Sequence, residues 1–156
     1  MVKNDVVIDA NILISTLIGS RSTIALITSP EYHFYAPRRI VDEILKNREV
    51  ICNKAFKTHV ECEMEMWALL RFVNLLEYSD YSKYVSEASN AIASRDVSDV
   101  DFLACALAIK AEFIWTEDKD FTAQKLVSVK STAQFMMKMR IFKYLNHLIS
   151  SKMRER

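Results

Sequence analysis

The stretch DVSDVDFLACALAIKAEFIWTEDKDF, residues 96–121, decides the fold. Its first half places small and apolar residues at helical spacing behind acidic and hydroxyl side chains, which is the pattern of a capped helix. Its second half is a short apolar run that ends in acids, which indicates a buried strand with carboxylates at its carboxyl end. The stretch therefore predicts a helix followed by a strand of an α/β fold.

A similar strand opens the chain, because DVVID at residues 5–9 is a β-branched run without polar alternation. Further strands are predicted at HFYAP (33–37), FVNLLEY (72–78) and LVSVKS (126–131). Helical patterns lie between the strands and after the last one, at residues 11–28 with Gly19 as an interruption, 38–47, 54–70, 82–95 and 131–156. Strands that alternate with helices predict a three-layer α/β/α fold with a central, mostly parallel sheet of about five strands.

The size and composition of the chain are those of one globular domain, predicted over residues 1–156. Hydrophobic residues make up 51% and charged residues 26%, and the formal net charge is +1, so the total charge indicates neither a nucleic-acid binder nor a membrane-surface protein. The apolar runs are shorter than the roughly 20 residues that span a bilayer. Asp5 and Asp9 also interrupt any secretory signal, so we expect a cytoplasmic protein without a membrane partner.

The three cysteines, Cys52, Cys62 and Cys105, have no CxxC spacing. This pattern favours reduced thiols in the core over a disulfide framework or a zinc site. Because the chain contains a single glycine, the glycine-rich loops that bind nucleotide phosphates are excluded as well.

Four acids are expected to gather at one edge of the sheet. Asp9 and Asp118 each follow a short apolar strand, and the carboxyl ends of parallel strands meet at one edge. Asp99 opens the helix before the second of these strands, and Glu43 lies in the helix after residues 33–37. Converging carboxylates repel each other, and a hard cation such as Mg²⁺ or Mn²⁺ removes that penalty. The sequence therefore predicts a metal site suited to phosphodiester hydrolysis.

Each acid also has an ordinary structural explanation. Asp99 is a good helix-capping residue, Asp118 and Asp120 fit a solvated turn, and Glu43 fits an exposed helix face. Asp9 is harder to explain in this way, because an acid directly after a buried strand is either desolvated at a cost or functional. Four such coincidences at one edge favour a site.

These segments resemble the PIN-domain family, which includes the VapC-type toxin nucleases. The matching stretches are VVIDANILIS, PRRIVDEILKN and residues 96–121, which together cover about a third of the chain. The resemblance implies Mg²⁺ or Mn²⁺ dependence and an RNA substrate. By motif position it implies catalytic carboxylates at Asp9, Glu43, Asp99 and Asp118, metal ligands at Asp9, Asp99, Asp118 and Asp120, and supporting roles for Asn11 and Thr116.

The register of the third acid stays open among Asp96, Asp99 and Asp101, which lie close together in the sequence. Asp99 is preferred because its distance from Thr116 fits the spacing usual in the family. Arg38, Arg39 and Lys119 are candidates for contact with RNA phosphates; ordinary solvated surface is the alternative for each of them.

The resemblance predicts a metal-dependent endoribonuclease, with the toxin of a toxin–antitoxin pair as its more specific form. An antitoxin protein and a homodimer would then be the expected partners. The middle segment KAFKTHVECEMEMWALLRF (54–72) departs from the toxin members. The alternative is a non-catalytic PIN-like scaffold that binds RNA or a protein partner.

Two other classes that carry an aspartate after the first strand fit less well. A phosphotransfer receiver domain requires an aspartate at the end of its third strand, where this sequence has Glu77 and Tyr78. A haloacid-dehalogenase-type phosphatase requires a second aspartate two residues after the first, where this sequence has Asn11.

Overall fold

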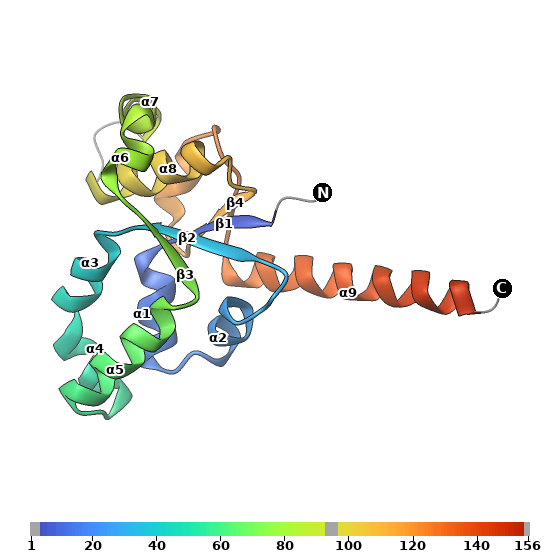
Figure 1. Ribbon diagram of the computed structural model, residues 1–156, viewed down its shortest axis with the longest axis horizontal. Coiled ribbons are helices and arrows are strands. Elements are labelled where there is room, and N and C mark those ends of the chain that lie inside the picture. The colour runs from blue at the N-terminus through green and yellow to red at the C-terminus, as the bar shows by residue number, and fades with distance from the viewer. Residues whose placement is uncertain (1–3, 93–96, 155–156) are drawn as a thin grey trace.

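The computed structural model describes residues 4–92 and 97–154. Within this part of the chain, five parallel strands form one sheet in the order β3-β2-β1-β4-β5 (Figure 1). The strands are β1 (Asp5–Ile8), β2 (His33–Pro37), β3 (Val73–Leu76), β4 (Phe113–Trp115) and β5 (Val129–Lys130). The predicted α/β fold is confirmed, and the sheet is parallel throughout.

Helices cover the sheet on both sides, so the molecule has three layers (Figure 1). One helical layer contains α1 (Ala10–Ile18), α2 (Arg21–Ile27), α3 (Ile40–Lys46), α4 (Arg48–Ala55) and α5 (His59–Leu70). The other contains α6 (Tyr78–Tyr81), the 3₁₀ turn η1 (Ser82–Tyr84), α7 (Val85–Ile92) and α8 (Val97–Ile109). After β4 come the 3₁₀ turn η2 (Lys119–Ala123) and, last, α9 (Thr132–Arg154).

The two central strands are buried on both faces, which explains their composition. Every residue from Val6 to Ile8 and from Phe113 to Trp115 is completely inaccessible to solvent. A strand covered by helices on both faces has no solvent side, so its apolar residues run together instead of alternating with polar ones. The same runs made β1 and β4 recognisable in the sequence.

The strand order places a topological switch point between β1 and β4. From β1 the chain moves outward to β2 and β3 on one side, then returns to β4 and moves outward to β5 on the other. In open parallel sheets, ligands bind at the carboxyl edge beside this point, where the loops from neighbouring strands diverge. The segments that begin at Asp9 and Thr116 leave the sheet there.

Several predicted elements were wrong in their bounds, among them the strand predicted at 126–131, of which only Val129–Lys130 is a strand. The helical stretch 11–28 is two helices, separated where Gly19 has a positive φ of 122°. The helix predicted at 54–70 is also two, because Phe56 is left-handed and Thr58 starts α5 with a capping box. The strand predicted at 72–78 ends at Leu76, since Tyr78 already begins α6.

Helix α9 begins in the core and leaves it. Phe135 is fully buried, and its ring packs edge-on against Tyr32, Phe113 and Trp115, with centroid separations of 4.9, 5.0 and 5.0 Å. Beyond Met139 the helix projects away from the body of the molecule (Figure 1). No helix in the described residues is both long enough and apolar enough to cross a membrane.

Candidate functional site

Asp9 stands at the junction of β1 and α1. Its backbone N–H donates to the carbonyl of Trp115 at 3.0 Å, which continues the pairing of β1 with β4. Its side chain caps α1, because Oδ1 accepts a hydrogen bond from the Ala10 N–H at 2.7 Å. Only 8% of the residue is exposed. A carboxylate is therefore held almost out of water at the switch point.

The Thr116 hydroxyl connects the ends of the two central strands. It donates to Asp9 Oδ2 at 2.6 Å, and its oxygen accepts from Asn11 Nδ2 at 3.3 Å and from the Asp118 N–H at 2.9 Å. Two pairs of residues, more than 100 positions apart in the sequence, are thus joined in one cluster, the switch-point cluster of Asp9, Asn11, Thr116 and Asp118. The sequence predicted all four as site residues.

Asp118 is oriented by the turn that follows it. Its Oδ1 accepts a hydrogen bond from the Asp120 N–H at 2.9 Å and so caps η2. Asp120 is exposed, as is Lys119 between them. A cavity of about 290 Å³ opens beside this turn, and Thr116, Asp118, Lys119, Ser131 and Gln134 are among the residues that line it.

Burial and charge act together on the Asp9 carboxyl group. Burial raises its pKa above the ordinary value, the hydrogen bonds from Thr116 and Ala10 oppose the rise, and the charge of Asp118 adds to it. The charge of Asp118 therefore destabilises the charged form of Asp9. A cation bound between them and the solvent would relieve that repulsion.

Asn11 supplies a further oxygen in the same cluster. Its amide nitrogen is engaged by Thr116, while its buried Oδ1 has no hydrogen-bond partner among the described residues. An unsatisfied buried acceptor costs about 1–3 kcal/mol, and a water or ion commonly satisfies it. Carboxylate and amide oxygens are the ligands that Mg²⁺ and Mn²⁺ prefer, so the donor atoms of the cluster fit such a cation.

A second charged group, the Arg39 triad, lies beyond the end of β2 and consists of Arg39, Glu43 and Asp101. Arg39 Nη1 lies 2.6 Å from Asp101 Oδ2, and Arg39 Nε lies 4.0 Å from Glu43 Oε1. Asp101 is 7% exposed. The hydrogen bond to Asp101 is the main cause that raises the pKa of the Arg39 guanidinium. Arg39, predicted to contact RNA, therefore pairs both with Glu43, predicted as catalytic, and with the buried Asp101.

The predicted third acid, Asp99, lies on α8 two residues before Asp101 of the Arg39 triad. Asp99 occupies the first turn of α8 and is partly buried, which suits the helix dipole. Asp101 is two residues further on, and side chains two apart on a helix do not face the same way. Asp96 lies outside the described residues. The pairing of Asp101 with Arg39 was not foreseen, although an acid between Val100 and Phe102 on an apolar helix was a signal for a buried ion pair.

The other predicted phosphate contacts differ in their surroundings. Arg38 is exposed and forms an ion pair with Glu77, whereas Lys119 lies beside Asp118 at the rim of the cavity. Arg38 belongs to neither the switch-point cluster nor the Arg39 triad. Among the described residues, no three acidic, histidine or cysteine side chains are already arranged as a metal site. Two carboxylates are nevertheless enough for Mg²⁺, which keeps several waters and completes its shell with substrate oxygens.

Comparison with known proteins gives one family. The comparison with curated proteins finds no match. A family profile described as PIN domain matches residues 7–149, which is most of the chain. Proteins of this family are generally nucleases and commonly bind divalent metals. Together with the all-parallel sheet and the acids at its switch point, this match shows that the chain belongs to the PIN-domain family.

Proposed function

We propose that this PIN domain is an endoribonuclease that hydrolyses RNA phosphodiester bonds with Mg²⁺ or Mn²⁺. The observation that carries the proposal is the switch-point cluster, in which Thr116 holds the Asp9 carboxylate and the Asp118 backbone at the carboxyl edge of the sheet. A pair of interacting carboxylates in this position binds no phosphate by itself, because both partners are anionic. The pair becomes useful when it holds a cation.

Asp9 and Asp118 would hold the metal, and the Asn11 amide oxygen is placed to orient a water beside them. When bound, the metal would neutralise charge on the phosphate and lower the pKa of a water that it binds. Thr116 keeps the Asp9 carboxylate in one orientation by donating to Oδ2, so a single oxygen direction is presented. Hydrogen bonds of this kind orient the carboxylates that bind metals.

Glu43 and Asp99 complete the predicted acid set from the side of β2 and α8. Arg39 compensates the charge of Asp101, which allows a further acid to remain near this edge without adding to the repulsion. Lys119 at the rim of the neighbouring cavity is the best-placed candidate for contact with a flanking phosphate. Arg38 and Arg39 would first have to leave their carboxylate partners.

A more specific role as the toxin of a toxin–antitoxin pair stays a prediction, as does an antitoxin partner. Induced expression in a bacterial host tests it: the toxin role requires growth arrest by the native chain and normal growth with Asp9→Asn. The non-catalytic scaffold remains the alternative to the nuclease, and it is tested in the same purified preparation.

The test of the nuclease is cleavage of an end-labelled single-stranded RNA by the purified chain with Mn²⁺ or Mg²⁺. Cleavage that EDTA and Asp9→Asn abolish, and that the exposed-acid variant Asp42→Asn retains, supports the proposal. A DNA strand of the same sequence separates RNA from general nucleic-acid cleavage. Binding of RNA without any metal-dependent cleavage would favour the scaffold instead.

A further inference from the structure

The cavity beside η2 is continuous with the switch-point cluster, and we call it the switch-point cavity. Its volume is about 290 Å³, and its lining includes two members of the cluster, Thr116 and Asp118. The other lining residues come from the turn after β4, from β5 and from the start of α9, namely Glu117, Lys119, Thr122, Val129, Ser131 and Gln134. A phosphate held beside Asp9 and Asp118 would therefore have one of its two nucleosides next to this cavity.

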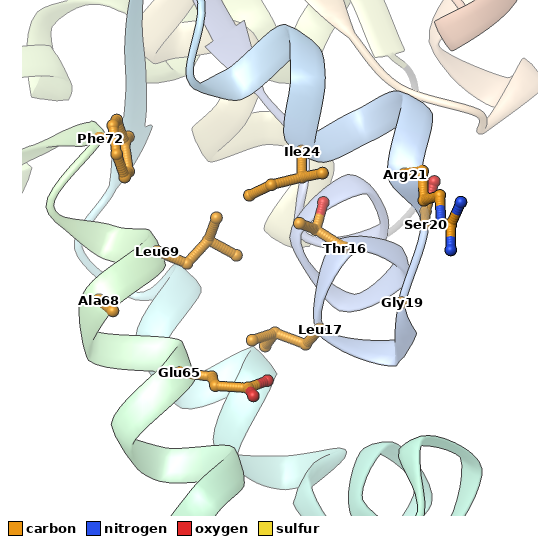
Figure 2. Close-up of a pocket in the computed structure, with 10 residues that line it drawn as sticks. All are labelled: Thr16, Leu17, Gly19, Ser20, Arg21, Ile24, Glu65, Ala68, Leu69 and Phe72. Carbon is orange, nitrogen blue, oxygen red and sulfur yellow. The ribbon is translucent and has the colours of Figure 1, made fainter.

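An apolar pocket elsewhere on the molecule is not placed to receive that nucleoside. It lies between α1, α2 and α5 and has a volume of about 350 Å³ (Figure 2). Leu17 and Ile24 lie across it from Leu69 and Phe72, and none of the described residues that line it belongs to the switch-point cluster. The nucleotide beside the scissile phosphate is thus expected to meet the switch-point cavity.

Charge also favours RNA on this side of the cluster. Residues 121–154 contain seven Lys and Arg and no Asp or Glu, whereas residues 1–120 contain 13 Lys and Arg against 19 Asp and Glu. The total of +1 therefore hides an acidic body and a basic C-terminal part. Val129, Ser131 and Gln134 bring the basic part to the wall of the cavity. Because RNA is a polyanion, the basic part attracts it to this wall.

The first turn of α9 holds the Gln134 side chain in one orientation. Its Oε1 accepts a hydrogen bond from the Ser131 N–H at 2.8 Å, and Ser131 Oγ accepts one from the Gln134 N–H at 3.2 Å, so the two residues form a capping box. The Ser131 N–H therefore identifies the oxygen of the amide and leaves Nε2 as a free donor. Neither Nε2 nor the Ser131 hydroxyl proton has an acceptor among the described residues.

These free donors distinguish two classes of base. Guanine and uracil carry keto oxygens, which accept hydrogen bonds, whereas adenine and cytosine carry amino groups in the corresponding places. An amino group that faces a donor leaves both unsatisfied, at a cost in free energy. Glu117 is the lining acid outside the cluster, and its Oε1 already accepts from the Thr132 N–H at 2.6 Å. The wall therefore favours a keto base.

We propose that the switch-point cavity receives the base next to the scissile phosphate and that Gln134 selects guanine or uracil there. The inference rests on the proposed nuclease function and names the substrate that the site prefers. Gln134 is a specificity residue in this scheme, and Lys119 stays available for a flanking phosphate. Single-stranded RNA is commonly read in this way, by hydrogen bonds to the edges of unstacked bases. A base that leaves the amide donor unpaired should be cleaved about tenfold less often.

The test is cleavage of an RNA pool with a randomised central stretch, followed by sequencing of the fragment ends at low conversion with Mn²⁺. Gln134→Glu keeps an oxygen for the Ser131 N–H but replaces the free donor by an acceptor, so the preference should reverse toward adenine and cytosine. Gln134→Ala removes the group and should leave a preference below about threefold. Asn146→Ala removes an exposed amide further along the same helix and should keep the native preference.

The preference is a ratio within one reaction, so a general loss of rate from the added charge or from a weaker cap cancels. A reversal in Gln134→Glu is a result that capping of α9 alone would not produce. Equal cleavage at all four bases by the native chain, a native preference for adenine or cytosine, or a preference that both Gln134 variants retain would overturn the inference and leave the nuclease standing. Absence of cleavage by the native chain would overturn the proposed function and this inference together.

Discussion

At the scale of single residues, Asp9 lies at the candidate site, but burying its carboxylate costs free energy of folding. It caps α1 and receives the Thr116 hydrogen bond, yet it is almost fully buried and faces the charge of Asp118. Residues that are held in a strained electrostatic environment commonly trade stability for function. Replacing this carboxylate by an amide separates its effect on stability from its role in the candidate site.

Asp9→Asn should abolish metal-dependent cleavage and raise the free energy of unfolding at neutral pH by about 1 kcal/mol, or about 2–4 °C in Tm. The reason is that asparagine can keep the cap on α1 without a buried charge. Thermal unfolding at pH 7 measures the stability, with Asp42→Asn on the surface of α3 as the control. A lower Tm for Asp9→Asn would show that the carboxylate is net stabilising.

The same substitution should show a characteristic dependence on pH. The pKa of Asp9 in the folded protein is raised above that of the unfolded chain, about 3.9. The folded state therefore binds the proton more tightly, and the free energy of unfolding falls as pH rises from the unfolded pKa to the folded pKa. The stability advantage of Asp9→Asn should thus be small at about pH 4 and grow toward neutral pH. Tm values measured across this range would contradict the account if the advantage shrank instead.

Two neighbouring arginines should differ sharply in their contribution to stability. Arg39→Gln leaves the buried Asp101 without its partner and should cost on the order of 2 kcal/mol, reduced by the partial exposure of Arg39. Arg38→Gln breaks an exposed pair with Glu77 and should cost less than about 1 kcal/mol. Urea denaturation of the two variants makes the comparison, and equal losses would contradict it.

The sequence predicted the neighbours in the switch-point cluster but not the Arg39 triad. Asp9 and Asp118 follow apolar runs, so parallel pairing of those runs was enough to predict that they approach each other. Arg39 and Asp101 lie 62 residues apart, in a turn and a helix whose mutual orientation no local pattern specifies. The catalytic and metal-binding roles of the individual acids stay predictions.

At the scale of elements, buried strands were easier to predict than the breaks between helices. The runs VVI and FIW are recognisable because two covering layers remove every polar position. The break before α5 depends on a left-handed Phe56, a conformation that glycine or asparagine would have signalled and phenylalanine does not. Helix α4 was missed because it is short and its apolar residues Val50, Ile51 and Cys52 are consecutive instead of helically spaced.

Phe135 is the most deeply buried side chain that attaches α9 to the core. Phe135→Ala should lower the free energy of unfolding by about 3–5 kcal/mol, because it opens a cavity among the rings of Tyr32, Phe113 and Trp115. Phe135→Leu fills part of that space and should cost less. Chemical denaturation with far-ultraviolet circular dichroism measures both, and equal effects would show that ring packing is not the cause.

At the scale of the whole molecule, the strand order does more than local sequence to create the site. An order that changes direction between β1 and β4 brings Asp9 and Thr116 to one edge, from which the two loops diverge. The same architecture leaves the basic α9 outside the acidic body.

We propose that the carboxylates at the switch point make this PIN domain a metal-dependent ribonuclease. The most direct test is the single-turnover rate of RNA cleavage as a function of Mn²⁺ concentration for the native chain, Asp118→Asn and Glu117→Gln. These adjacent substitutions each remove one negative charge, but only Asp118 belongs to the switch-point cluster. We expect at least a hundredfold loss for Asp118→Asn and a near-native rate for Glu117→Gln. Equal rates for the two variants, or cleavage that persists in EDTA, would contradict the account.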